Sequence, residues 1–276
     1  MRQETMKTFL TLALCAALTF AQAPPPRKKK LLAIGAVYGF QHDSVSSGLA
    51  TMWKIGHDTG LWDTYIRTDT QLITKKKIPA GNAKNLDYFD AIYFYTTGEF
   101  PLDDEQKAAL LSFVHDDGKG IIGGHSAIDS NYKWAEYGEM MGAYFDQHPW
   151  GQFMAPIIIE DPNFPAMKDF PKTFSMMDEI YQPSKEFSRD KIRVLARLDE
   201  NKLDLTNKNV HRTDKDFAVA WIKTYGKGRV FYSTFGHREE VYDRPDVQHM
   251  YLEATKWAMR LTDYDATPEP RPADSK

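Results

Sequence analysis

Short apolar runs alternate with amphipathic segments in the first half of the chain, and this pattern constrains the fold most. Residues 31–37, 90–95 and 118–124 are apolar runs of strand length, and segments 45–59 and 102–116 between them have helical spacing. A continuous apolar run is typical of a strand buried on both faces. The alternation therefore predicts an α/β fold with a mainly parallel central sheet and helices on both faces.

The second half contains strand-like segments at a density that favours mixed or antiparallel additions to that sheet. No repeat or change of composition marks a second domain, so we expect one domain over residues 31–262. The proline-containing segment 263–276 is expected to be disordered. The further predicted elements are strands at 62–67, 155–160, 174–181, 192–198, 218–225 and 229–235, and helices at 132–141 and 247–261.

The N-terminus has the pattern of an export signal, with basic residues before an apolar run at 9–20 and small residues at Ala21–Ala23. We expect residues 1–23 to be a signal peptide, residues 24–30 to be a linker, and the protein to be periplasmic or extracellular. The apolar run is too short for a permanent membrane span. Stable membrane insertion is therefore not expected once the signal is removed.

Charge and cysteine content exclude two classes of function. The net charge is −3, and the basic runs at 27–30 and 75–77 have no interleaved aromatic residues, so nucleic-acid binding is not expected. The single cysteine, Cys15, lies inside the predicted signal. The mature chain therefore has no thiol nucleophile and no disulfide.

The stretch from Gly118 to Asp129 predicts a buried strand that enters a Gly-rich turn, where open α/β sheets place their chemistry. Four of the eight histidines also follow predicted strands or lie in a nearby loop, and we expect some of them to converge. They are His42, His125, His148 and His237, with Asp43, Ser126, Asp129, Asp146, Glu239 and Glu240 close to them in sequence.

Three chemistries fit such a cluster. Imidazole and carboxylate ligands suit a divalent metal, although no short His-x-x-x-His spacing is present. Metal-free acid/base catalysis is the second, because histidine titrates near neutral pH. A hydrolase built on Ser126 is the third, but the turn lacks the Gly-x-Ser-x-Gly arrangement.

Several aromatic residues admit two interpretations. They could line a sugar-binding cleft, or they could pack in the core and at its rim, which is the commoner role for any single one. Trp150, between a proline and a glycine in a predicted loop, is the one that we expect to be exposed. The residues are Trp134, Tyr137, Trp150, Tyr181 and Trp221.

Spaced motifs from Leu31 to Leu261 together resemble the ThuA-like, trehalose-utilisation family. That resemblance implies the class I glutamine amidotransferase-like fold, a flavodoxin-like three-layer sandwich. The motifs are Gly39–Ser44, Gly124–Ala127 with Asp129, Tyr137–His148 with Pro149, Glu160–Pro162, Asp178-Glu179 with Tyr181, Ala220-Trp221, and Gly236-His237 with Glu239.

Within this resemblance, Gly123–Ala127 is similar to the amidotransferase elbow, with His125 where the nucleophilic cysteine would be. His237-Arg238-Glu239 is similar to the His-x-Glu of the same enzymes. Without a thiolate, glutaminase chemistry through a thioester is not available.

The resemblance implies a role in the metabolism of trehalose or a related disaccharide or keto-sugar. We expect a sugar-modifying enzyme (a hydrolase, lyase or isomerase), and the alternative is a non-catalytic carbohydrate-binding or accessory protein. The expected partner is a small-molecule sugar, and the sequence leaves open whether the protein forms a homo-oligomer. The catalytic candidates are His125, His237 and Glu239; the substrate-binding candidates are His42, Asp43, Ser126, Asp129, His148, Trp150, Glu179 and Tyr181; the candidate ligands for a divalent metal such as zinc are His42, His125, His148 and His237.

Overall fold

A computed structural model describes residues 27–77, 79 and 84–272, and the predicted signal peptide lies outside these residues. The strands are β1 (Lys29–Ile34), β2 (Trp62–Arg67), β3 (Ala91–Phe94), β4 (Gly120–Gly124), β5 (Phe145–Gln147), β6 (Gln152–Ile159), β7 (Thr173–Glu179), β8 (Gln182–Pro183), β9 (Arg193–Leu198), β10 (Ala218–Tyr225) and β11 (Gly228–Ser233). The α-helices are α1 (Val45–Thr59), α2 (Asp104–His115), α3 (Ala135–Met141) and α4 (Pro245–Ala258).

Nine strands form one mixed sheet in the order β2-β1-β3-β4-β11-β10-β9-β6-β7. The pairs from β2 to β11 are parallel, and those from β11 to β7 are antiparallel. The parallel half agrees with the predicted parallel sheet, and the antiparallel half agrees with the additions expected from the second half of the chain, so the sheet is mixed rather than mainly parallel. The parallel order is broken where β10 and β11 are joined by Gly226-Lys227, because a two-residue connection can link only antiparallel strands.

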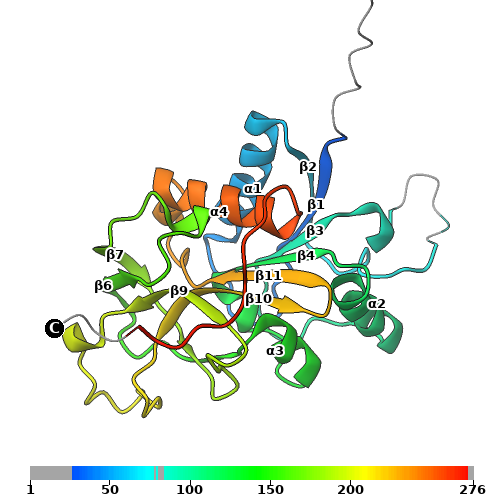
Figure 1. Ribbon diagram of the computed structural model, residues 1–276. Coiled ribbons are helices and arrows are strands. Elements are labelled where there is room, and N and C mark those ends of the chain that lie inside the picture. Colours follow the sequence, from blue (N-terminus) through cyan, green and yellow to red (C-terminus); the bar gives the residue numbers. More distant parts are fainter. Residues whose placement is uncertain (1–26, 78, 80–83, 273–276) are drawn as a thin grey trace, which may run out of the picture.

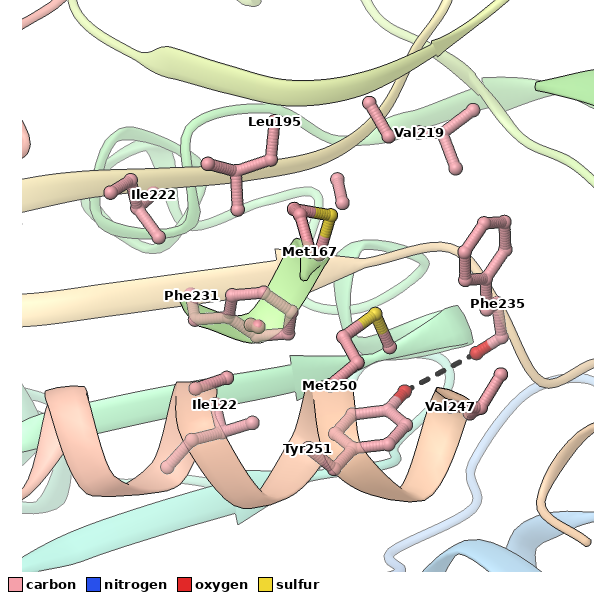
Figure 2. Packing of buried hydrophobic residues seen from close by; sticks show 14 of the residues in the cluster. Ile122, Met167, Leu195, Val219, Ile222, Phe231, Phe235, Val247, Met250 and Tyr251 are labelled. Atoms are coloured by element: carbon pink, nitrogen blue, oxygen red, sulfur yellow. Dashed lines mark hydrogen bonds between the residues drawn. The ribbon is translucent and has the colours of Figure 1, made fainter. Parts of the chain in front are cut away.

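Helices cover both faces of this sheet, as the alternation of elements predicts (Figure 1). Residues of α1 and α4 pack into one hydrophobic cluster, and residues of α2 and α3 pack into another. Figure 2 shows the first cluster, in which Met250 and Tyr251 of α4 face Phe231 of β11. The Tyr251 hydroxyl donates to the Phe235 carbonyl at 3.3 Å, so a buried polar group in this layer is satisfied.

The helix boundaries follow local signals in the sequence. Helix α1 occupies the predicted range and ends at Gly60, whose φ of 67° is the left-handed conformation that glycine adopts most easily. Helix α2 begins with a capping box, in which Asp103 accepts from the backbone of Gln106 and Gln106 accepts in return. Ser44 is the N-cap of α1 by position but makes no capping hydrogen bond, because its hydroxyl has other partners.

The small β5–β8 ribbon and the C-terminal segment differ from the sequence-based expectations. The ribbon was not predicted, since its strands have only three and two residues. Residues 263–272, in the segment expected to be disordered, lie against the domain: Tyr264 donates to Asp161, and Arg271 pairs with Glu200. Among the described residues, no helix combines the length and apolarity that crossing a membrane requires.

Candidate metal centre

Three histidines and one glutamate converge beyond the ends of the strands. His42, His125, Glu179 and His237 each offer a ligand atom, and these atoms all lie within 4.8 Å of one another. His125 directly follows β4, Glu179 is the last residue of β7, and the other two lie in the loops after β1 and β11. The carboxyl ends of the parallel strands thus bring the three histidines together, as in other open α/β sheets, and the end of β7, which pairs antiparallel with β6, adds the glutamate.

His125 is held in one tautomer and in a strained backbone conformation. Its φ of 39° is left-handed, which is uncommon for a residue with a side chain. Its Nδ1 lies 2.7 Å from the Thr234 carbonyl, which can only accept, so Nδ1 carries the proton. Its Nε2 has no hydrogen-bond partner although it is buried. The free lone pair of Nε2 is therefore available to a ligand in the centre.

Close packing around this elbow leaves little freedom. The Tyr232 hydroxyl donates to the His125 carbonyl at 2.6 Å. A side chain at Gly124 would place its Cβ 2.5 Å from the Tyr93 hydroxyl, so only glycine fits there without movement. The Tyr181 ring lies 4.3 Å from the His125 ring, measured between centroids. Packing and hydrogen bonds together maintain the strained conformation of His125.

His42 and His125 are neutral imidazoles. Burial, followed by the charge of His237, lowers the pKa of His42 to about 4. Complete burial is the main cause that holds the pKa of His125 well below its ordinary value. The three histidine rings contact one another edge to face, with centroids 4.8 to 5.2 Å apart. The neutral imidazoles of His42 and His125 are therefore in the protonation state that metal binding requires.

His237 and Glu179 form the charged half of the centre. His237 Nδ1 lies 3.2 Å from Glu179 Oε1, an ion pair by distance without the alignment of a hydrogen bond. Burial lowers the pKa of His237, but the Glu179 carboxylate outweighs burial and the pKa is raised. Burial likewise raises the pKa of Glu179, but His237 outweighs it and the pKa is lowered. A metal cation in the centre would replace the positive charge of His237 as the partner of the Glu179 carboxylate.

His148 lies at the rim, where its Nδ1 is 3.8 Å from Glu179 Oε2 and its side chain is 47% exposed. The β5–β8 ribbon positions it, because His148 directly follows β5 and Tyr181 directly precedes β8. The Tyr181 hydroxyl lies 3.3 Å from His42 Nε2. The ribbon therefore contributes one solvent-facing histidine and one buried phenol to the site.

Buried groups outside the centre hold the loop that carries His237. Ser44 Oγ lies 2.8 Å from the His237 carbonyl and 2.5 Å from the Tyr95 hydroxyl, which in turn lies 2.8 Å from the Gly236 carbonyl. The Asp178 carboxylate accepts from the backbone N–H groups of Gly236 and Arg238. Such supporting groups fix the orientation of a ligating side chain.

The structure brings together His42, His125 and His237, as the sequence predicted, and adds Glu179, which had been assigned to substrate binding. His148 is at the rim and outside the group of four. Asp43 and Glu239 line a pocket that opens onto His42 and His237. Asp129 accepts from Tyr132 at 2.5 Å, and Ser126 is buried with no partner for its Oγ.

Most of the five aromatic residues take the commoner of the two roles considered, packing in the core and at its rim. Four of the five are at least 93% buried, and of these only Tyr181 also reaches the site, through its hydroxyl near His42: Trp134, Tyr137, Tyr181 and Trp221. Trp150 is half-buried, because its ring packs against Phe153 and Phe217 and its Nε1 donates to the Asp204 carbonyl. An exposed aromatic residue at the site is Phe40, which the sequence pattern does not identify as a sugar contact.

Sequence reasoning also missed the supporting groups Ser44, Tyr95 and Asp178. Ser44 appears in the sequence only as part of the Gly39–Ser44 motif, and Tyr95 only as the last residue of the strand predicted over 90–95. Their signal was positional, because Ser44 follows β1 and Tyr95 follows β3 at the same edge of the sheet. A search for hydroxyl groups as well as for histidines after the predicted strands would have included both.

Comparisons with known proteins agree with this architecture. A family profile described as "ThuA: Trehalose utilisation" matches residues 30–258. A ThuA-like protein from Bacteroides uniformis ATCC 8492 is similar at 20% identity and a TM-score of 0.68, over 86% of this chain and 94% of that one. One from Parabacteroides merdae ATCC 43184 shares 16% identity at a TM-score of 0.64, over 90% and 95%. No curated protein matches the sequence.

Proposed function

The chain belongs to the ThuA (trehalose utilisation) family, and on that premise we propose that it is an enzyme that acts on a sugar through a divalent-metal centre. Family membership supports a role related to carbohydrate metabolism. The observation that carries the proposal is the convergence of His42, His125, Glu179 and His237 within 4.8 Å. Buried polar atoms without a hydrogen-bond partner are uncommon in proteins. Three such atoms lie together in this centre: His42 Nδ1, His125 Nε2 and His237 Nδ1.

Zinc is the metal that we propose. Three imidazoles and one carboxylate are ligands that zinc accepts, and zinc–ligand distances of about 2 Å imply ligand atoms roughly 3.3 Å apart. The ligand atoms of His237 and Glu179 lie 3.2 Å apart, those of His125 and Glu179 lie 3.9 Å apart, and all four lie within 4.8 Å of one another, so the side chains would rotate inward to bind zinc. A bound zinc ion polarises oxygen groups and lowers the pKa of bound water.

The protein's own residues would bind and exchange protons around that ion. His125 is fixed by Thr234 and remains neutral, so of the two roles that the sequence leaves open, acid/base catalyst and metal ligand, we assign it that of a ligand. His148 is half exposed and close to Glu179, and we assign proton exchange with solvent to it. The reaction class that this supports is acid/base chemistry at a sugar hydroxyl or carbonyl group: hydrolysis, elimination or isomerisation.

Glutaminase chemistry is not part of the proposal. The order β2-β1-β3-β4-β11 in the parallel half supports a flavodoxin-like origin of that half, with an antiparallel extension. At the elbow after β4 the chain has His125, and its one cysteine belongs to the predicted signal peptide. The elbow supplies a metal ligand in this proposal and has no nucleophile.

Metal analysis and turnover of the same preparations test the proposal. Protein purified without a histidine tag should contain about one equivalent of zinc. His125→Ala should lose the metal and the turnover of disaccharides or keto-sugars, while His57→Ala, which removes an exposed histidine of α1, should retain both. Turnover by a metal-free protein would favour simple acid/base catalysis. Metal and sugar binding without any product would favour an accessory protein.

A further inference from the structure

A polar pocket with a volume of about 370 Å³ opens onto two of the four residues of the centre, His42 and His237. This volume is near the lower end of the range for small-molecule sites, so the pocket suits a ligand of limited size. Its walls come from the loops after β1 and β11 and from the start of β6. The remaining lining residues are Phe40, Gln41, Asp43, Gln152, Arg238, Glu239 and Glu240.

Phe40 is the aromatic wall of this pocket. Its side chain is 64% exposed, and its ring centroid lies 4.8 Å from that of His42, at an interplanar angle of 70°. The face of a phenyl ring carries partial negative charge and attracts the positive edges of C–H bonds. A pyranose ring has one face of such C–H groups. An exposed Phe40 next to the centre is therefore suited to stack a sugar ring within reach of His42 and His237.

Three carboxylates line the pocket, those of Asp43, Glu239 and Glu240, and they outnumber its two cationic groups, Arg238 and His237. Arg238 is the one guanidinium group, and it already contacts Gln152 at 2.9 Å and Glu240 at 3.1 Å. Among the described residues, the carboxylates of Asp43 and Glu239 have no ion-pair or hydrogen-bond partner. Carboxylates accept hydrogen bonds from hydroxyl groups, and they repel anions at short range. The walls therefore favour a ligand with many hydroxyls and no negative charge.

We propose that this pocket holds one uncharged pyranose ring, stacked on Phe40 and hydrogen-bonded by Asp43 and Glu239, next to the metal centre. The protein thereby selects neutral glycosides against sugar phosphates and uronates. This inference rests on the proposed function, because it places the ring where the centre can act on it. In a disaccharide, the second ring extends from the pocket toward solvent.

Calorimetric titration of the metal-loaded protein tests the inference. The neutral probes are methyl α-D-glucopyranoside and trehalose, and the anionic probes are glucose 6-phosphate and glucuronate. We expect both neutral probes to bind, and both anions to bind at least tenfold more weakly. Phe40→Ala should weaken the binding of the neutral probes about tenfold, and Phe40→Trp should preserve it. Trp53→Ala removes an aromatic side chain of α1 that is 49% exposed and should change nothing.

The charge of the walls has its own test. The double variant Asp43→Asn with Glu239→Gln should reduce the discrimination against glucose 6-phosphate to less than threefold. Failure of both neutral probes to bind, equal binding of the anions by the native protein, or unchanged binding by Phe40→Ala would overturn the inference.

Zinc content is measured in each preparation, which separates the two proposals. Stoichiometric zinc without binding of a neutral sugar overturns the pocket inference and leaves the metal centre standing. Sugar binding that depends on Phe40 in a protein that takes up no zinc supports the pocket and overturns the proposed metal centre.

Discussion

Replacement of Ser44 by alanine tests whether buried hydroxyl groups position His237. Ser44 is fully buried, and three short contacts connect it and Tyr95 to the carbonyl groups of Gly236 and His237. The hydroxyl groups of Ser44 and Tyr95 have two protons to donate, and there are three contacts. If each proton goes to one carbonyl, both loop carbonyls are satisfied, and loss of Ser44 leaves the His237 carbonyl buried without a donor.

The expected magnitude has two parts. A buried acceptor left without its partner costs about 1–3 kcal/mol, so the free energy of unfolding of Ser44→Ala should fall by that amount. Loss of a group that orients a metal ligand typically lowers metal affinity about 10- to 100-fold. Helix α1 should not weaken, because the Ser44 side chain makes no capping hydrogen bond and its carbonyl still accepts from Gly48.

The measurements are urea unfolding of the metal-free protein and zinc competition against a chromophoric chelator. Ser46→Ala is the matched control, since Ser46 lies on the same helix with its exposed hydroxyl bonded to the Asp43 carbonyl. It should change neither quantity appreciably. Reduced stability with a zinc affinity within twofold of the native value would refute a positioning role for Ser44.

Two further changes have defined outcomes. Asp178→Asn replaces a carboxylate that accepts from the Gly236 and Arg238 N–H groups by an amide that has donors of its own. The free energy of unfolding should therefore fall by about 1–3 kcal/mol. An unchanged urea denaturation curve would contradict this. Burial lowers the pKa of Lys223 from 10.5 to about 8. Between pH 8 and pH 10.5 the folded chain therefore binds fewer protons than the unfolded chain. The free energy of unfolding should rise with pH across this window, by up to about 3 kcal/mol. Lys223→Met should lack this rise in unfolding measured from pH 7 to pH 11, and an equal rise in both proteins would contradict the assignment.

The parallel half of the fold and three of the four centre residues could be predicted from the sequence. Strand-length apolar runs identify the strands, and His42, His125 and His237 follow such strands at one edge. Glu179 could be named but not assigned, because it ends an antiparallel strand whose position in the sheet depends on non-local pairing. Trp150 shows the same limit: a loop between Pro149 and Gly151 predicts exposure, yet Phe153 and Phe217 cover much of the ring.

The elbow after β4 connects the fold to the proposed chemistry. A left-handed backbone at His125 aims the side chain out of the sheet edge, as it would aim a nucleophile. An imidazole in that position cannot act as the thiolate does, and burial keeps it neutral. The Thr234 carbonyl after the neighbouring strand β11 then fixes Nδ1, which leaves Nε2 facing Glu179, at 3.9 Å. A strained turn suited to present a nucleophile is therefore equally suited to present one metal ligand, and the loops after β1 and β11 and the end of β7 supply the other three.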